Sequence, residues 1–153
     1  MLCIATFYLQ EAILKILHTS DWHLGKKLKN VSRLQEQKQV LNELIEYVET
    51  SDIDVVIIAG DVYDVFSPSA SAEELFYSVL KELSNKTRAV IVISGNHDDN
   101  SRVTAGASVC YDYGVLFATK EFLRPLKLKR VEVVRANERF FEIKDNNGET
   151  VFF

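Results

Sequence analysis

The sequence is poor in the residues that build disulfide scaffolds and histidine-rich metal sites. Its 153 residues include only two cysteines, Cys3 and Cys110, which rules out a disulfide-stapled fold and fits a reducing compartment. Only three histidines are present, His18, His23 and His97, and this shortage limits the metal chemistry that the chain can support. No apolar run reaches the ~18 residues of a membrane span, and the start lacks the features of a signal peptide. We therefore expect a cytoplasmic protein without membrane contact.

The overall composition is that of one globular domain with a mild negative charge. Hydrophobic residues make up 47% and charged residues 26% of the chain, close to the globular average. The net charge of −4 argues against a broad attraction to nucleic acid, although it allows a local basic face. Residues 1–12 are apolar but interrupted by Gln10 and Glu11. We expect them to form a poorly ordered extension before a domain that spans residues 13–153.

Three apolar runs alternate with two amphipathic segments. The runs at 13–18, 55–59 and 89–93 predict strands, and the β-branched content of the last two favours burial on both faces of a parallel sheet. Helices are expected at about 32–48 and 71–83. Both expected helices open on a capping-box pattern, formed by Ser32 with Gln35 and by Ser71 with Glu74. This βαβαβ order predicts an α/β fold with right-handed crossovers.

The pattern becomes weaker after residue 98. A short helix is expected at 103–109 and strands at 131–134 and 140–143, with residues 145–148 as a hairpin turn. Residues 124–139 carry six cations: Arg124, Lys127, Lys129, Arg130, Arg135 and Arg139. They could face a polyanion, but a solvated edge strand guarded by charge explains them equally well.

Polar side chains follow each of the three predicted parallel strands. In chain order they are Asp21 and His23, then Asp61 and Asp64, and then Asn96, His97 and Asp98. In a parallel sheet these loops emerge at the same carboxyl edge, where open α/β sheets bind ligands. Gly60 and Gly95 precede two of the clusters and permit tight turns. We therefore expect the three clusters to converge, although each one alone would also suit an ordinary turn.

The residue types in these clusters favour a centre for two divalent metal ions. The expected ligands are Asp21 and His23 for one ion, Asn96 for the other, and Asp61 for both. Mixed oxygen and imidazole ligands suit Mn²⁺, Fe²⁺ or Zn²⁺ better than Ca²⁺. Two such ions about 3.5–4 Å apart can hold a phosphate for in-line attack by water. His97 would then stabilise or protonate the leaving oxygen, with Asp98 fixing its orientation.

Three motifs, in this order, resemble those of the calcineurin-like metallophosphoesterase superfamily. Residues 21–23 (DWH) match its D-x-H motif, residues 60–64 (GDVYD) its G-D-x-x-D motif, and residues 95–98 (GNHD) its G-N-H-D motif. The longer segments HTSDWHLG, AGDVYD and SGNHD, the last followed by Ser101-Arg102, are similar to the SbcD-like nucleases of that superfamily. This resemblance extends from about residue 13 to residue 107.

The resemblance implies a nuclease subunit for DNA recombination and repair that dimerises and works with an SbcC-type ABC ATPase. It implies Mn²⁺-dependent 3′-to-5′ exonuclease cleavage of duplex DNA and endonuclease cleavage of single strands and hairpins. The implied roles are Asp21, His23, Asp61 and Asn96 as metal ligands, His97 and Asp98 in catalysis, and Asp64 in support of the ligands. Lys26, Lys27 and Arg102 are candidate DNA contacts, although a solvated loop is the better-supported interpretation of the lysines.

The chain departs from the family pattern after its third motif. The family takes three more metal ligands from later histidines, and no histidine follows His97 here. We therefore expect the amino-terminal part of a metallophosphoesterase domain, with an incomplete sheet, and leave the activity of the isolated chain open. Two other functions fit the sequence: a phosphodiesterase or phosphatase for small molecules, and a non-catalytic fragment that dimerises or docks on a partner.

Overall fold

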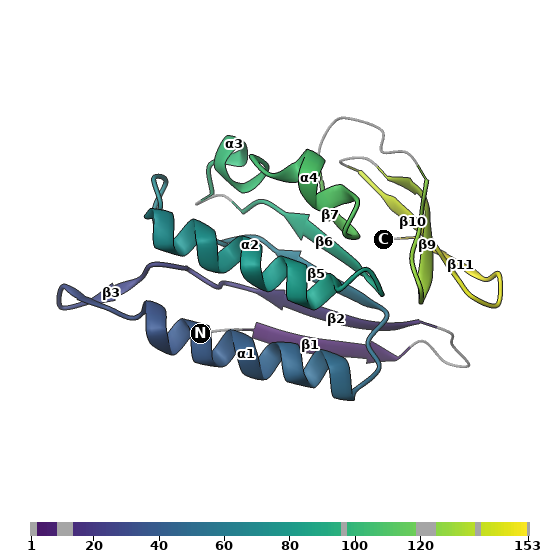
Figure 1. The fold of residues 1–153 in the computed structure, drawn as a ribbon, viewed down its shortest axis with the longest axis horizontal. Coiled ribbons are helices and arrows are strands. Elements are labelled where there is room, and N and C mark those ends of the chain that lie inside the picture. The colour runs from purple at the N-terminus through teal and green to yellow at the C-terminus, as the bar shows by residue number, and fades with distance from the viewer. Residues whose placement is uncertain (1–2, 9–13, 96–97, 119–124, 137–138, 153) are drawn as a thin grey trace.

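The described part of the chain folds into two main β-sheets and a small two-stranded hairpin, with helices covering one face of the larger sheet. The computed structural model describes residues 3–8, 14–95, 98–118, 125–136 and 139–152. The larger sheet has the strand order β1-β2-β5-β6-β7 (Figure 1). Its strands are β1 Cys3–Tyr8, β2 Lys15–Ser20, β5 Val55–Ala59, β6 Ala89–Ile93 and β7 Val115–Phe117. Strands β2, β5, β6 and β7 are parallel, which confirms the predicted α/β fold.

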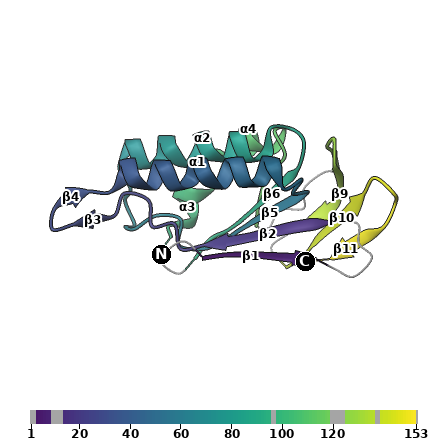
Figure 2. The ribbon, with the colours of Figure 1, turned by 90° about the horizontal axis from the view of Figure 1, so that it is seen from below.

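Two long helices, α1 Leu34–Thr50 and α2 Ala70–Ser84, lie side by side on one face of this sheet (Figure 2). Their apolar stripes join the inward side chains of the strands in one core that includes Leu41, Leu44, Phe76 and Leu80. Burial of these stripes on the sheet is the main stabilising term for both helices. Two short helices follow β6, α3 Asn100–Val103 and α4 Ala107–Tyr111.

A second sheet packs against the opposite face, close to the amino ends of the parallel strands. Its order is β11-β10-β9-β8, with β8 Leu126–Lys127, β9 Val131–Ala136, β10 Phe141–Asp145 and β11 Thr150–Phe152. Val133 and Ile143 of this sheet share a core with Ile16, Val55 and Ala89, which lie early in their own strands. The carboxyl ends of the parallel strands therefore lie away from this second core.

Most predicted elements occur, but several boundaries were wrong. Helix α1 is preceded by Arg33, and the Ser32 hydroxyl accepts from the Leu34 N–H instead of forming a capping box. The N-cap of α2 is Ser69, whose hydroxyl accepts from the Ala72 N–H, so the predicted cap Ser71 lies inside the helix. In place of the helix expected at 103–109, α3 and α4 overlap only the two ends of that range.

Strands β1, β7 and β8 and the two strands of a small hairpin were not anticipated. Residues 3–8, expected in a poorly ordered extension, form β1 antiparallel to β2, and this pairing satisfies backbone groups on the outer edge of β2. A small hairpin, β3 Lys27–Leu28 with β4 Val31–Ser32, projects from the loop between β2 and α1. Among the helices that the structure describes, none is both long and apolar enough to cross a membrane.

Candidate metal centre

The loops after β2 and β5 run side by side at the carboxyl edge of the sheet, the left-hand end in Figure 1. The His23 N–H donates to the Asp61 carbonyl at 2.9 Å, and the Leu24 N–H donates to the Val62 carbonyl at 2.8 Å. The loop after β5 is also tied to the end of β6, because the Gly60 N–H donates to the Ile93 carbonyl at 2.8 Å. Backbone hydrogen bonds thus continue past the ends of β2 and β5 and bring together the polar clusters that follow these two strands.

Asp21, His23 and Asp61 present a compact group of ligand atoms. One atom from each side chain lies within 4.8 Å of the others, a spacing that a single metal ion can fill. The His23 Nε2 lies 3.8 Å from Asp21 Oδ1 and 3.9 Å from Asp61 Oδ2. On the other side of the ring, His23 Nδ1 lies 3.7 Å from Asp64 Oδ1. A proton on Nδ1 would therefore face Asp64, leaving Nε2 available as a ligand.

The carboxylate of Asp61 fits a cation in particular. Its Oδ1 is buried and has no hydrogen-bond partner, which is costly for a carboxylate unless a positive charge occupies the site. Gly95 lies directly against this group, because a β-carbon at position 95 would come within 2.4 Å of both the Asp61 amide nitrogen and Oδ1. The donor set of two carboxylates and an imidazole suits Mn²⁺, Fe²⁺ or Zn²⁺.

All three grouped residues adopt left-handed backbone conformations. Their φ angles are +60° at Asp21, +45° at His23 and +51° at Asp61. Such conformations are unfavourable for residues with a β-carbon and persist where surrounding contacts enforce them, most often at functional sites. Here the hydrogen bonds between the loops enforce them. The local fold therefore directs all three side chains toward one point.

Asp98 holds two of the loops together through their backbones. Its Oδ2 accepts from the N–H groups of Val62 and Gly95 at 3.1 and 2.8 Å, and its Oδ1 accepts from the Tyr63 N–H at 3.0 Å. The side chain is buried, so these three charge-assisted bonds are sheltered from water. In the structure Asp98 positions the loops after β5 and β6. Next to it, burial raises the pKa of the Tyr63 phenol far above its ordinary value, so this phenol stays protonated.

The sequence matches the calcineurin-like phosphoesterase family over residues 14–152. The chain belongs to this family. The SbcD subunit of nuclease SbcCD from Bacillus subtilis (strain 168) is 41% identical to it over 126 residues, which cover 82% of this chain. Those residues are 32% of the length of the relative, so the chain spans about a third of that protein. The family assignment and the Asp21–His23–Asp61 group agree on a metal site at this edge of the sheet.

Other residues that the sequence singled out fall in different places. Asn96 and His97, the predicted second-ion ligand and catalytic residue, lie outside the residues that the structure describes. Lys26 lies beside the centre, with its Nζ 3.7 Å from Asp64 Oδ1. Lys27 is exposed at the start of the β3–β4 hairpin, and Arg102 on α3 contacts Glu73 of α2 at 3.4 Å. These placements leave their predicted roles as predictions.

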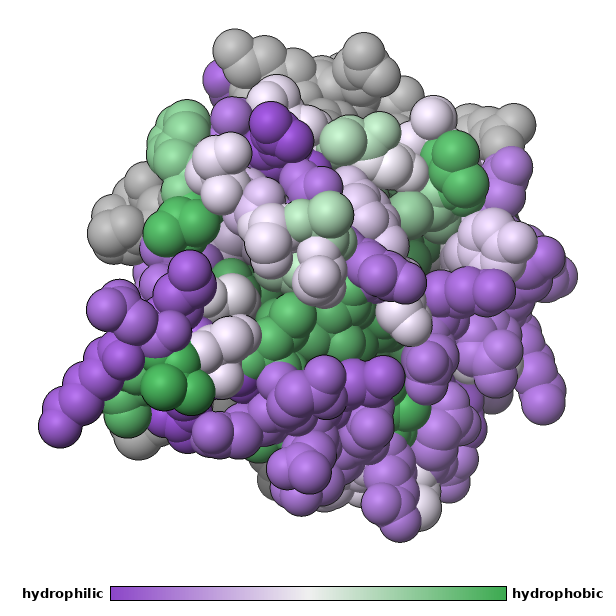
Figure 3. Space-filling model, turned by 60° about the vertical axis from the view of Figure 1, so that its left-hand side comes forward, coloured by the Kyte–Doolittle hydropathy of each residue, from purple (hydrophilic) through white to green (hydrophobic). Residues whose placement is uncertain are grey.

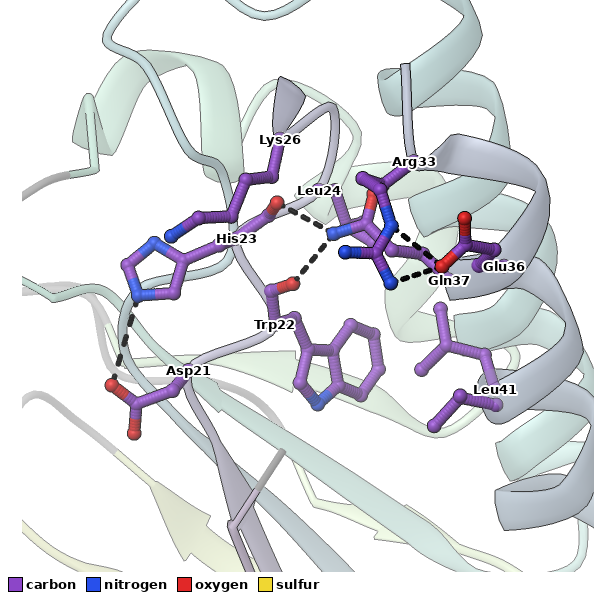
Figure 4. Close-up of a pocket in the computed structure, with 10 residues that line it drawn as sticks. Asp21, Trp22, His23, Leu24, Lys26, Arg33, Glu36, Gln37 and Leu41 are labelled. Atoms are coloured by element: carbon purple, nitrogen blue, oxygen red, sulfur yellow. Dashed lines mark hydrogen bonds and ion pairs between the residues drawn. The ribbon is translucent and has the colours of Figure 1, made fainter. Parts of the chain in front are cut away.

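A hollow of about 370 Å³ lies next to Asp21 and His23, between their loop and the start of α1 (Figure 4). Its floor is apolar, with Trp22 and Leu41 among its lining residues. Figure 3 shows such a hydrophobic hollow rimmed by hydrophilic side chains on this side of the molecule. Gln37 also lines the hollow, and sequence reasoning missed it. The missed signal was a polar residue on the otherwise apolar stripe of the first helix.

Proposed function

We propose that this chain is the amino-terminal part of a nuclease that hydrolyses DNA phosphodiesters with the help of divalent metal ions. The observation that carries the proposal is the convergence of Asp21, His23 and Asp61, which offer ligand atoms within 4.8 Å of one another. The other oxygen of Asp61, Oδ1, is buried without a hydrogen-bond partner. The family supplies the reaction class, phosphoester hydrolysis. The similarity to the SbcD subunit of nuclease SbcCD supports DNA as the substrate.

Two metal ions, Mn²⁺ in the first instance, fit the proposed ligand set. Asp21 and His23 would hold one ion, Asn96 the other, and Asp61 both. The two oxygens of Asp61 differ in surroundings, since Oδ2 faces His23 while Oδ1 is buried against Gly95, and this difference suits a bridging carboxylate. When bound, the ions supply charge for phosphate binding and activation of water.

The remaining site residues have roles in positioning and proton transfer. Asp64 lies between His23 and Lys26, where it orients the imidazole ring. His97 would protonate or stabilise the leaving oxygen of the DNA strand. Asp98 anchors the start of the loop after β6 through its bond to the Gly95 N–H.

The proposal extends to binding of DNA and of partner proteins. Lys26 beside the centre, Lys27 in the β3–β4 hairpin and Arg102 on α3 would neutralise phosphates of the substrate. By the same similarity, the protein would dimerise and assemble with an SbcC-type ABC ATPase in DNA recombination and repair. The protein would act in the cytoplasm, again by this similarity.

A cleavage assay with Mn²⁺ tests the proposal. We expect the full-length protein that contains this segment to cut labelled duplex and hairpin oligonucleotides, and its Asp61→Asn variant to cut them at least about 100-fold more slowly, because a central metal ligand is lost. The matched control is Asp112→Asn, which changes an exposed aspartate at the end of α4. Equal rates for Asp61→Asn and the wild type, or no cutting by the wild type, would contradict the proposal. Preference for small phosphodiesters over DNA would favour the small-molecule alternative.

A further inference from the structure

The side-chain amide of Gln37, in the first turn of α1, contacts the backbone of the loop that carries His23. Its Oε1 accepts from the Gly25 N–H at 3.0 Å. Its Nε2 donates to the carbonyls of Trp22 and His23 at 3.0 and 2.7 Å (Figure 4). One side chain thus satisfies three backbone groups within four consecutive residues.

With these bonds, residues 22–25 are held by hydrogen bonds on two sides. The N–H groups of His23 and Leu24 donate to the loop after β5, on one side of the segment. Gln37 binds the neighbouring carbonyls from the other side. His23 and Gly25 both have positive φ, +45° and +87°, and such conformations persist where the surroundings over-determine them.

The chemistry of an amide is required at this position. Only a side chain with both a carbonyl oxygen and an N–H₂ group can accept from Gly25 and donate to Trp22 and His23 at once. Gln37 lies between Leu34 and Leu41 on the side of α1 that faces the protein, where an apolar residue would be expected. A partly buried polar residue there needs its hydrogen bonds, and Gln37 makes them with the loop.

We propose that Gln37 is a positioning residue, which fixes the backbone of His23 so that its imidazole Nε2 faces Asp21 and Asp61. This inference rests on the proposed role of His23 as a metal ligand. It makes α1 part of the metal centre, although no residue of α1 belongs to the group of ligand atoms that the structure describes.

Two substitutions separate the bonds of Gln37. Gln37→Met removes all three while keeping the length of the side chain. Gln37→Glu keeps an acceptor for the Gly25 N–H but cannot donate to the carbonyls of Trp22 and His23 at neutral pH. Gln39→Met, at an exposed position of the same helix, is the matched control.

Amide hydrogen exchange and Mn²⁺ calorimetry, both on the full chain, give the readouts. We expect Gln37→Met to accelerate exchange of the Gly25 amide about tenfold in metal-free protein, with amides of β5 and β6 unchanged. Gln37→Glu should preserve that protection. Both variants should weaken Mn²⁺ binding about tenfold, as loss of groups that orient ligands does elsewhere. The added negative charge of Gln37→Glu would by itself strengthen Mn²⁺ binding, so weaker binding by this variant would report the loss of positioning.

The two proposals fail in different ways. Wild-type exchange at Gly25 in Gln37→Met would overturn the positioning role, whatever the chain does to DNA. Faster exchange throughout the sheet in both variants, or unchanged Mn²⁺ affinity, would also overturn it, because Gln37 would then be a general structural residue or irrelevant to the site. Absence of DNA cleavage with the expected exchange and affinity changes would overturn only the nuclease assignment.

Discussion

Three left-handed residues, Asp21, His23 and Asp61, share one group of ligand atoms. Other turns of the chain, such as Lys29-Asn30, also have positive φ, so it is the grouping of these side chains that distinguishes the metal centre. Each left-handed residue with a β-carbon costs about 1–2 kcal/mol relative to a relaxed conformation. Bringing two carboxylates close together adds repulsion in the absence of a cation. The hydrogen bonds between the loops offset this cost. A strained conformation that lowers stability is typical of residues selected for function, here metal binding.

Substitution of Asp61 tests the strain directly. With a chelator present, we expect urea titrations to give Asp61→Gly a free energy of unfolding about 1 kcal/mol higher than that of Asp61→Ala. The reason is that glycine adopts a φ of +51° without penalty. At an unstrained helical position the order is reversed, so Glu43→Ala should be more stable than Glu43→Gly by about 1 kcal/mol. If the free energy of unfolding of Asp61→Ala equals or exceeds that of Asp61→Gly, the backbone at residue 61 is not strained.

At the level of elements, Arg88 joins the ends of α1 and α2 to the start of β6. Its side chain is only 1% exposed. The Nε donates to the Ile53 carbonyl at 2.9 Å, and Nη1 donates to the Leu83 carbonyl at 2.7 Å and to Glu49 at 2.8 Å. This cation therefore satisfies carbonyls at the end of the molecule opposite the metal centre.

From the ion pair between Arg88 and Glu49 we expect the free energy of unfolding to depend on pH in the acid range. The Arg88 hydrogen bond lowers the pKa of Glu49 below its ordinary 4.5, so the ionised carboxylate stabilises the fold above that pH and this contribution is lost as the pH falls through the lowered value. Glu49→Gln should be less stable than the wild type at pH 7, by less than about 1 kcal/mol because Glu49 is half exposed. The difference should disappear at acid pH in urea titrations. A constant difference, or an equal effect of Glu46→Gln, would contradict this.

The sequence predicted the buried strands better than the loops. The runs at 55–59 and 89–93 became β5 and β6 with the same bounds, because β-branched residues buried on both faces leave little choice of structure. The β3–β4 hairpin was missed because its turn, Lys29-Asn30, adopts positive φ without glycine. The caps depend on the exact path of the chain into each helix, which local propensity does not specify.

The sequence predicted which strand ends would meet, but not the contacts that hold them. Asp21, His23 and Asp61 lie together because parallel strands end at the same edge of the sheet, while their roles stay predictions. The contacts of Gln37 and of Asp98 with backbone groups depend on tertiary geometry, which leaves little trace in the order of residues.

At the scale of the whole molecule, the metal centre lies at the carboxyl edge of the sheet, away from the second sheet. The second sheet packs near the amino ends of the parallel strands, and the long helices cover the other face. The core under the helices extends into the loops of the centre, because Trp22, Leu24 and Val62 belong to it. Although the chain has a net charge of −4, one cation, Lys26, lies beside the centre.

The most direct test of the metal centre is anomalous diffraction from crystals of this chain grown with Mn²⁺. We expect a manganese peak within coordination distance of Asp21, His23 Nε2 and Asp61, and no such peak in Asp61→Asn crystals. Absence of a peak at this group at millimolar Mn²⁺, or a peak only elsewhere on the surface, would contradict a metal centre here and favour a non-catalytic module that docks on a partner.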